Sequence, residues 1–138
     1  LYPWGDQLDP TRVNSCKYTI PRCPAQHDFD DGFAESAPVK SFPTGASPYG
    51  VLNMLGNVSE WTADWYLESY HQSLGVVNPA YEDRKNYPKN DRSVRGGDFE
   101  NMIDKLVITR RDPIPPDHAS STIGFRVVIL SEQIFQNE

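Results

Sequence analysis

The sequence predicts a single α+β domain in which a small sheet of short antiparallel strands is joined by long loops, with little helix. Twelve prolines and nine glycines in 138 residues interrupt almost every segment, and both residue types disfavour regular helices. A chain of this length buries roughly two-thirds of its unfolded surface, so one hydrophobic core is expected. Residues 50–66, called the central stretch below, add a third observation, because turn formers there lead into an alternating apolar and polar pattern.

The central stretch predicts a tight turn that feeds a half-buried strand. Gly56 and Asn57 tolerate the positive φ that such a turn needs. After them, Trp61 and Trp65 fall on one side of an extended segment while Glu60 falls on the other. Asn57 also begins an Asn-Val-Ser glycosylation pattern, but a glycan inside this turn would compete with packing.

The segments around the central stretch read as irregular structure. Residues 1–9 predict an extended segment that is docked on the core by Tyr2 and Trp4. Residues 37–48 contain three prolines, which suits an edge segment rather than a central strand. Residues 67–90 are polar and tyrosine-rich, and we expect a long surface loop there.

The C-terminal part predicts three more strands. Residues 93–99 contain a short strand followed by two adjacent glycines, which mark a bulge or a close approach of backbone. Residues 106–109 are a β-branched run and predict a buried strand. Residues 123–130 are apolar on both faces, the pattern of a central strand, except for Arg126, which should then be paired. Residues 131–138 form a polar tail that is expected to fray.

The charge and apolar patterns exclude two classes of partner. A net charge of −6 and no cluster of basic residues argue against binding to a nucleic-acid backbone. No apolar run reaches the length of a membrane span, and no basic segment precedes an apolar one at the N-terminus. The sequence begins at Leu1 without a methionine, which is typical of a processed product or a fragment.

Cys16 and Cys23 leave two interpretations open. They can close a short disulfide loop, which requires an oxidising compartment, or they can be unrelated free thiols. Two cysteines at this spacing do not make a zinc site.

An acidic loop follows the N-terminal segment and also has two interpretations. Its oxygen donors are Asn14, Asp28, Asp30 and Asp31, with Gly32 where the loop must bend. The loop is either a solvated surface or a calcium site, since calcium requires several oxygens gathered on irregular backbone.

Six short motifs follow one another along the chain. They are Tyr2-Pro3-Trp4-Gly5, Asp31-Gly32-Phe33, Ala37-Pro38-Val39, Gly56-Asn57-Val58-Ser59-Glu60-Trp61, Arg95-Gly96-Gly97 and Gly124-Phe125-Arg126. Together they resemble the formylglycine-generating enzyme family, also called the sulfatase-modifying factor domain, over residues 1–130. The resemblance implies a C-type-lectin-like fold, of which this chain is the C-terminal half. We therefore expect the missing N-terminal half of the domain, or another protein subunit, as a partner.

The resemblance implies two structural calcium sites and sharpens the interpretation of the acidic loop. Both sets of matching positions are hard oxygen donors on loops, which suits calcium rather than zinc or copper. The first set is Asn14, Ser15, Asp31 and Phe33, and the second is Asn53, Gly56, Val58 and Glu60.

The resemblance also shows which chemistry is missing. Catalytic members carry two copper-binding cysteines five residues apart after the double glycine, and here Asn101 and Leu106 stand at those positions. Neither side chain can supply the soft thiolate that copper(I) selects, so no copper is expected. Cys16 and Cys23 cannot substitute, because they lie in the loop assigned to the first calcium. Asp98 replaces the serine that usually follows the glycines.

Iron chemistry is not expected either. A related branch of the family uses iron, but its histidine ligands come from a separate upstream domain. The three histidines of this chain, His27, His71 and His118, have no metal-type spacing and read as solvated loop residues.

The leading hypothesis is therefore a non-catalytic, calcium-stabilised pseudoenzyme that binds a protein partner or serves as a subunit of an exported assembly. Loops 67–90 and 98–104 would supply its specific surface. One alternative is an enzyme with altered chemistry in an acidic recess near Asp98 and Glu100. Another is a structural fragment of a larger processed chain.

Overall fold

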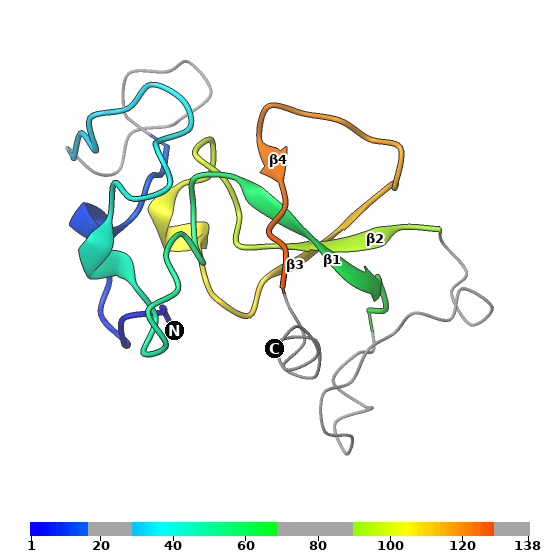
Figure 1. Cartoon of the computed structure of the whole chain (residues 1–138), viewed down its shortest axis with the longest axis horizontal. Coiled ribbons are helices and arrows are strands. Elements are labelled where there is room, and N and C mark those ends of the chain that lie inside the picture. The colour runs from blue at the N-terminus through cyan, green and yellow to red at the C-terminus, as the bar shows by residue number, and fades with distance from the viewer. Residues whose placement is uncertain (17–28, 69–89, 129–138) are drawn as a thin grey trace, which may run out of the picture.

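Loops dominate the structure, as expected. The computed structural model describes residues 1–16, 29–68 and 90–128, and within these ranges it contains four short strands, three 3-10 helices and no α-helix (Figure 1). The helices are η1 (Pro10–Arg12), η2 (Pro43–Gly45) and η5 (Ile103–Lys105). The strands are β1 (Ser59–Trp65), β2 (Arg92–Arg95), β3 (Arg111–Ile114) and β4 (Ile123–Gly124).

The four strands form one mixed sheet in the order β3-β2-β1-β4. β1 pairs antiparallel with β2, with a register irregularity between Trp61 and Trp65, and β2 pairs antiparallel with β3. β4 runs parallel to β1, with Glu60 opposite Gly124. The expectation of a purely antiparallel sheet was therefore wrong at this edge, because the chain returns to β1 by a crossover instead of a hairpin.

The central stretch has the predicted form. Gly56 and Asn57 lie in the left-handed region, with φ of 67° and 64°, and β1 begins two residues later. Trp65 is buried at the far end of β1, where the guanidinium of Arg92 lies 3.8 Å from its ring centroid. The turn-and-strand prediction is confirmed, and the tryptophan anchors β1 to β2.

The strand predicted at 106–109 is wrong. Leu106 directly follows η5 and its side chain is 1% exposed, whereas the strand begins only at Arg111. β3 contains Pro113, opposite Ser93 of β2. Proline is tolerated there because β3 ends the strand order. The apolar run reflects burial of one leucine in the core, not strand pairing.

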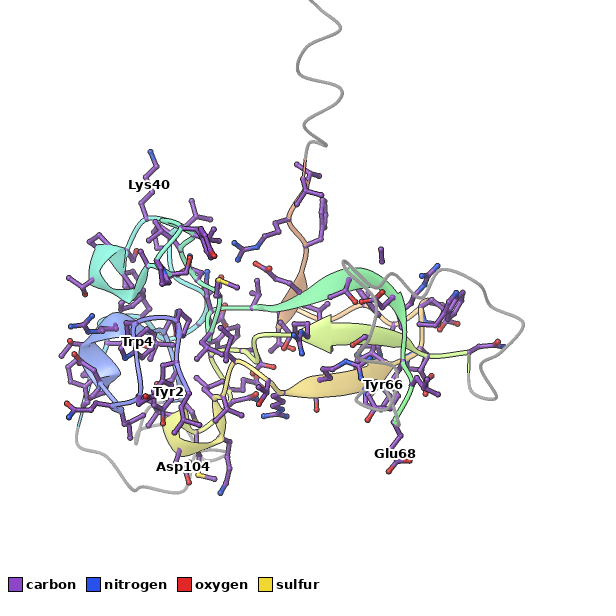
Figure 2. All side chains as sticks on the ribbon, turned by 90° about the horizontal axis from the view of Figure 1, so that it is seen from below. Tyr2, Trp4, Lys40, Tyr66, Glu68 and Asp104 are labelled. Atoms are coloured by element: carbon purple, nitrogen blue, oxygen red, sulfur yellow. The ribbon has the colours of Figure 1, made fainter. Side chains whose placement is uncertain are left out.

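The central strand predicted at 123–130 is also wrong for the residues that the structure describes. β4 covers only Ile123–Gly124 and ends the strand order on the other side. Phe125, Val127 and Val128 are 74%, 81% and 80% exposed, and Figure 2 shows the segment after β4 leading away from the sheet. Nothing in the described ranges covers these side chains, so this segment has the composition of a buried strand but is exposed to solvent here.

The predicted edge segment at 37–48 is not a strand. It contains η2, and its φ and ψ values change at each end of that helix. Proline at 38, 43 and 48 leaves too few backbone donors for a ladder. The segment packs through Phe42, which meets Phe33 edge to face at 6.0 Å between ring centroids.

The buried core lies at the opposite end of the molecule from Trp65. Its cluster consists of Val13, Leu55, Ile103 and Leu106, from three segments far apart in the sequence. Tyr2 and Trp4 pack against this cluster, and their rings stack with centroids 5.4 Å apart (Figure 2). The prediction of an N-terminal segment docked by two aromatic residues is confirmed.

Several expectations fall on residues outside the described ranges. They include most of loop 67–90, the polar tail 131–138, Asp28, Cys23, His27 and His71. Among the described helices, none has the length and apolar character needed to span a bilayer.

Candidate functional site

The two positions that the resemblance assigns to copper-binding cysteines meet at Gly97. Gly97 has φ of 66°, and a Cβ atom placed on it would lie 2.4 Å from Leu106 Cδ2 and 2.9 Å from Asn101 Oδ1. Both side chains therefore converge on one point beside the double glycine. The fold brings this pair of positions together as a two-thiolate site would require, but the side chains that occupy them are an isobutyl group and an amide.

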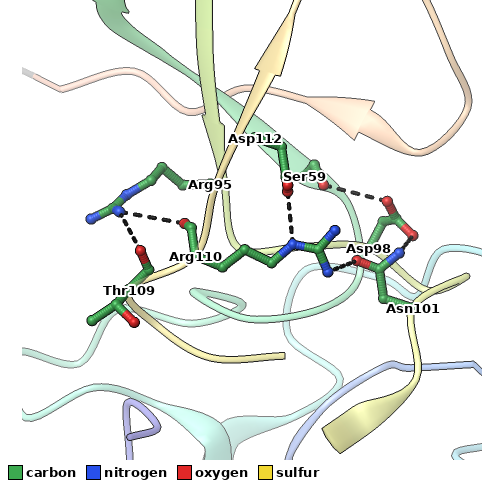
Figure 3. A network of polar contacts seen from close by, with 7 residues as sticks. All are labelled: Ser59, Arg95, Asp98, Asn101, Thr109, Arg110 and Asp112. Atoms are coloured by element: carbon green, nitrogen blue, oxygen red, sulfur yellow. Dashed lines mark hydrogen bonds and ion pairs between the residues drawn. The ribbon is translucent and has the colours of Figure 1, made fainter. Parts of the chain in front are cut away.

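Neither occupant is available for metal chemistry. Leu106 belongs to the hydrophobic core. The amide of Asn101 is held on both sides, because its Nδ2 donates to Asp98 Oδ1 at 2.8 Å and its Oδ1 accepts from Arg110 Nη1 at 3.0 Å (Figure 3). Arg110 Nε donates in turn to Asp112 Oδ2 at 2.8 Å. The donor set at these positions does not fit copper(I), which selects thiolates.

Asp98 is the centre of this polar network. Its Oδ1 also accepts from the Glu100 amide at 2.9 Å, and its Oδ2 lies 3.4 Å from the hydroxyl of Ser59 at the start of β1. Burial raises the pKa of the Asp98 carboxyl above its usual value; the Glu100 amide opposes that shift and the Glu100 charge adds to it. The hydrogen bonds of Asp98, Asn101 and Arg110 are directed at one another, so they stabilise the loop after Gly97 rather than present a reactive group.

Cys16 lies closer to this site than the sequence indicated. Its backbone amide donates to the Asn101 carbonyl at 2.9 Å. Membership of the loop assigned to the first calcium therefore does not explain why Cys16 cannot replace the missing ligands. The physical reason is different: Cys16 is disulfide-bonded, so it offers no thiolate. The only other cysteine of the sequence, Cys23, lies outside the described residues.

The first predicted calcium set is brought together by backbone contacts. The amides of Ser15 and Phe33 donate to the two carboxylate oxygens of Asp31 at 3.0 and 2.9 Å. Asn14 is 1% exposed and its Nδ2 donates to the Glu35 carbonyl at 2.8 Å. No donor within the described residues reaches its Oδ1. A buried carbonyl oxygen without a donor is costly, and a cation would satisfy it. The residues of this set therefore fit calcium.

Asp30, the other acidic residue of this loop that the structure describes, has a local role. It is exposed, and its Oδ1 accepts from the amide of Gly32 at 2.9 Å. This contact closes a turn of the kind that aspartate commonly forms.

Residues of the second predicted set already make hydrogen bonds within the protein. Asn53 Nδ2 donates to the Val39 carbonyl at 2.9 Å and the Gly56 amide donates to the Gly96 carbonyl at 3.0 Å. Both carboxylate oxygens of Glu60 accept from the guanidinium of Arg126. The expected pairing of Arg126 is confirmed, although its side chain is 36% exposed and not buried. The one carboxylate of this set is already paired with a positively charged group, which disfavours calcium there.

The turn at Gly56 and Asn57 contacts both predicted calcium sets, and the sequence did not predict how closely it packs. The Asn57 amide donates to the Asn14 carbonyl at 2.9 Å, and Asn57 Oδ1 accepts from the Ala37 amide at 2.8 Å. A Cβ on Gly56 would lie only 2.1 Å from the same Asn14 carbonyl. Asn57 is 6% exposed, which leaves no room for a glycan. The Gly-Asn dipeptide was the available signal, because both residues tolerate positive φ.

No other constellation of metal-type side chains is present in the described ranges. No group of three or more histidine, cysteine, aspartate or glutamate residues is placed to hold an ion there. This finding does not test the two calcium sets, which rely mainly on amide and backbone oxygens. His118 is exposed, as expected.

Comparison with known proteins gives one family. The family model described as the sulfatase-modifying factor enzyme 1-like domain matches residues 1–130. Over 131 residues the chain is 33% identical to the formylglycine-generating enzyme of Mus musculus, covering 91% of this chain and 33% of that protein. It is 31% identical to the inactive C-alpha-formylglycine-generating enzyme 2 of Mus musculus, covering 91% of this chain and 35% of that protein.

A solved structure is also similar. The variable protein 1 of Treponema denticola superimposes with a TM-score of 0.53 at 27% sequence identity, over 67% of this chain and 31% of that one. The chain spans about a third of the length of the curated relatives named above.

Proposed function

The chain belongs to the sulfatase-modifying factor enzyme 1-like domain family, and from this premise we propose that it is a non-catalytic, calcium-stabilised member that functions by binding another polypeptide. One observation carries the proposal. The positions of the two copper ligands converge at Gly97, yet they hold the buried Leu106 and the hydrogen-bonded Asn101. A relative whose name calls it inactive supports the same interpretation.

Calcium at the first set would stabilise the loop that carries it. Asn14 and Asp31 would offer side-chain oxygens, and Ser15 and Phe33 their carbonyls. A bound ion neutralises Asp31 and supplies the missing partner of Asn14 Oδ1, which tethers residues 29–33 to the segment beside η1. The proposed role is structural, because both oxygens of Asp31, the only ionisable group of the set, accept backbone amides of the same loop region.

The binding role rests on exposed apolar side chains at one edge of the sheet. Val39 and Phe125 line a recess of about 410 Å³, and Val127 and Val128 continue from it along the chain. Val39 is 70% exposed. Isolated exposed apolar residues are common, but a contiguous group beside an open strand edge is a typical protein contact. The partner we propose is the missing N-terminal half of the domain or another subunit, and a complete C-type-lectin-like fold is part of that proposal.

An exported location follows from the same set of features. The disulfide of Cys16 requires an oxidising environment to persist. Extracellular compartments and the secretory lumen also supply the calcium that the first set would bind. We therefore place the protein in the periplasm, the secretory pathway or the extracellular space.

Copper retention tests the absence of catalysis. The wild-type protein and the double variant Asn101→Cys/Leu106→Cys are loaded with copper(I), exchanged against a chelator and measured by elemental analysis. We expect the variant to retain copper and the wild type to lose it, because only the variant offers two converging thiolates. Stoichiometric copper or iron in the wild-type protein would refute the proposal.

A further inference from the structure

The guanidinium of Arg126 lies among four oxygen atoms of the central stretch. Its Nε and Nη2 donate to the two carboxylate oxygens of Glu60, both at 2.5 Å. Nη1 and Nη2 donate to the Leu52 carbonyl at 3.2 and 3.1 Å, and Nη2 also donates to the Asn53 carbonyl at 3.1 Å. One carboxylate and two backbone carbonyls around a positive group resemble the coordination of a metal cation, here with a planar organic ion at the centre.

This arrangement competes with calcium for the second set. Calcium takes six to eight oxygen ligands, and Glu60 is the only member of that set with a negative charge. An ion on Glu60 would have to share the carboxylate with the two N–H groups of Arg126 that donate to it. It would also place a second positive charge beside the guanidinium without adding a carboxylate. The oxygens of Gly56 and Val58 are neutral and cannot offset that repulsion.

The pairing of β4 with β1 places Arg126 beside Glu60. Because β4 runs parallel to β1 with Gly124 opposite Glu60, Arg126 follows two residues beyond the paired position and its side chain reaches back to the carboxylate. Glu60 is only 22% exposed, so the pair is shielded from water more than an ordinary surface ion pair. A cation that is covalently part of the chain is present at every calcium concentration.

The first set shows the opposite situation. Among the described residues, buried Asn14 Oδ1 has no hydrogen-bond donor, and Asp31 accepts from the amides of Ser15 and Phe33. Both oxygens of Glu60 instead accept from a guanidinium. The first set therefore has a buried oxygen that a cation would satisfy, whereas the second has a carboxylate that is already paired with a cation.

We propose that Arg126 is the resident cation of the central stretch, and that the second set takes no calcium while Arg126 is in place. The chain would then bind one calcium ion instead of two. The count of one rests on the proposed calcium site at Asn14 and Asp31, whereas the role of Arg126 does not.

A calcium titration tests the second set directly. Calcium chloride is titrated into the chelator-treated 138-residue protein, and bound ion is counted by equilibrium dialysis and calorimetry. Wild type is expected to bind one ion and Asp31→Asn none, with circular dichroism confirming that the variant is folded. One ion bound by Asp31→Asn and lost in Asp31→Asn/Glu60→Gln would overturn the inference.

Thermal unfolding of Arg126→Met tests the guanidinium independently. In chelator we expect the melting temperature to fall by about 5 °C or more, and millimolar calcium to restore part of the loss, because Glu60 is then free. Arg110→Met is the matched control, since it also breaks a half-buried arginine–carboxylate pair, here with Asp112 instead of Glu60. An unchanged melting temperature for Arg126→Met, or no more recovery with calcium than Arg110→Met shows, would refute the inference. A wild-type protein that binds no calcium would refute the proposed site at Asn14 and Asp31. The melting temperatures of Arg126→Met and Arg110→Met would still decide the role of Arg126.

Discussion

The contact between Gly97 and Leu106 makes a quantitative prediction about Gly97→Ala. An alanine at φ of 66° carries a backbone penalty of about 1 kcal/mol. Its Cβ would also lie 2.4 Å from Leu106 Cδ2, more than 1 Å inside the usual carbon–carbon separation of about 3.5–4.0 Å. Leu106 is 1% exposed and cannot move aside without disturbing the core. Overpacking of this kind costs about 1–3 kcal/mol, so the total loss of unfolding free energy should be about 2–4 kcal/mol.

Gly50→Ala is the matched control for the backbone penalty. Gly50 has φ of 76°, and a Cβ placed on it would meet nothing within 4 Å. Its loss should therefore be only the backbone cost of about 1 kcal/mol. The difference between the two alanine variants measures the steric contact at Gly97 alone.

A double-mutant cycle identifies Leu106 as the source of the clash. Leu106→Ala alone should cost about 2–5 kcal/mol, because it leaves a cavity in the core. In the Gly97→Ala background the same change should cost about 1–3 kcal/mol less, since it removes the overlapping atom. Urea unfolding followed by tryptophan fluorescence gives all four free energies. Additivity within about 0.5 kcal/mol, or equal losses for Gly97→Ala and Gly50→Ala, would show that the two ligand positions do not meet at Gly97.

Three further predictions concern buried polar groups and are read from the same urea experiments. Burial raises the pKa of the Asp98 carboxyl in the folded protein above its usual value of 3.8. As the pH rises, this carboxyl therefore ionises in the unfolded chain before it ionises in the folded protein. This difference lowers the stability of the wild type as the pH rises through and above 3.8, so Asp98→Asn should gain stability relative to wild type in that direction, and a flat difference would contradict this. Asn57→Ala removes the acceptor of the buried Ala37 amide and places alanine, which tolerates positive φ less well than asparagine, at φ of 64°. We expect the free energy of unfolding to fall by about 2–4 kcal/mol. A fall below about 1 kcal/mol would argue against the turn as an anchor. Ser93 Oγ is buried without a partner, so Ser93→Ala should leave stability within about 0.5 kcal/mol of wild type or raise it; a loss above about 1 kcal/mol would reveal a missing contact.

The local features of the fold were predictable where they follow from backbone chemistry. Gly56 and Asn57 determine the turn before β1 through their tolerance of positive φ. Twelve prolines similarly account for the scarcity of helix. The convergence of Asn101 and Leu106 could be anticipated only through the resemblance, because five residues of loop do not specify a contact by themselves.

The failures concern features that depend on tertiary context. Residues 106–109 have strand composition, but η5 turns the chain so that Leu106 enters the core and no partner strand is available. Residues 123–128 have the composition of a buried strand, yet the layer that would bury them is absent from the described ranges. The pairing of Glu60 with Arg126 was not predicted either, because Glu60 was assigned to calcium and the sequence indicated no particular partner for Arg126.

The parallel pairing of β4 with β1 has a consequence for the order in which the protein is made. Arg126 is 66 residues beyond Glu60 and 74 beyond Leu52, whereas the contact of Asn14 with Asn57 involves residues that are all synthesised earlier. A chain emerging from the ribosome can therefore close its N-terminal loops while Glu60 is still uncompensated. The contacts of Arg126 with Glu60 and Leu52 form after these N-terminal contacts, because they close a longer loop and carry its entropic cost. A chain truncated between Leu106 and Arg126 would contain every residue of the core cluster but would lack the guanidinium that pairs with Glu60.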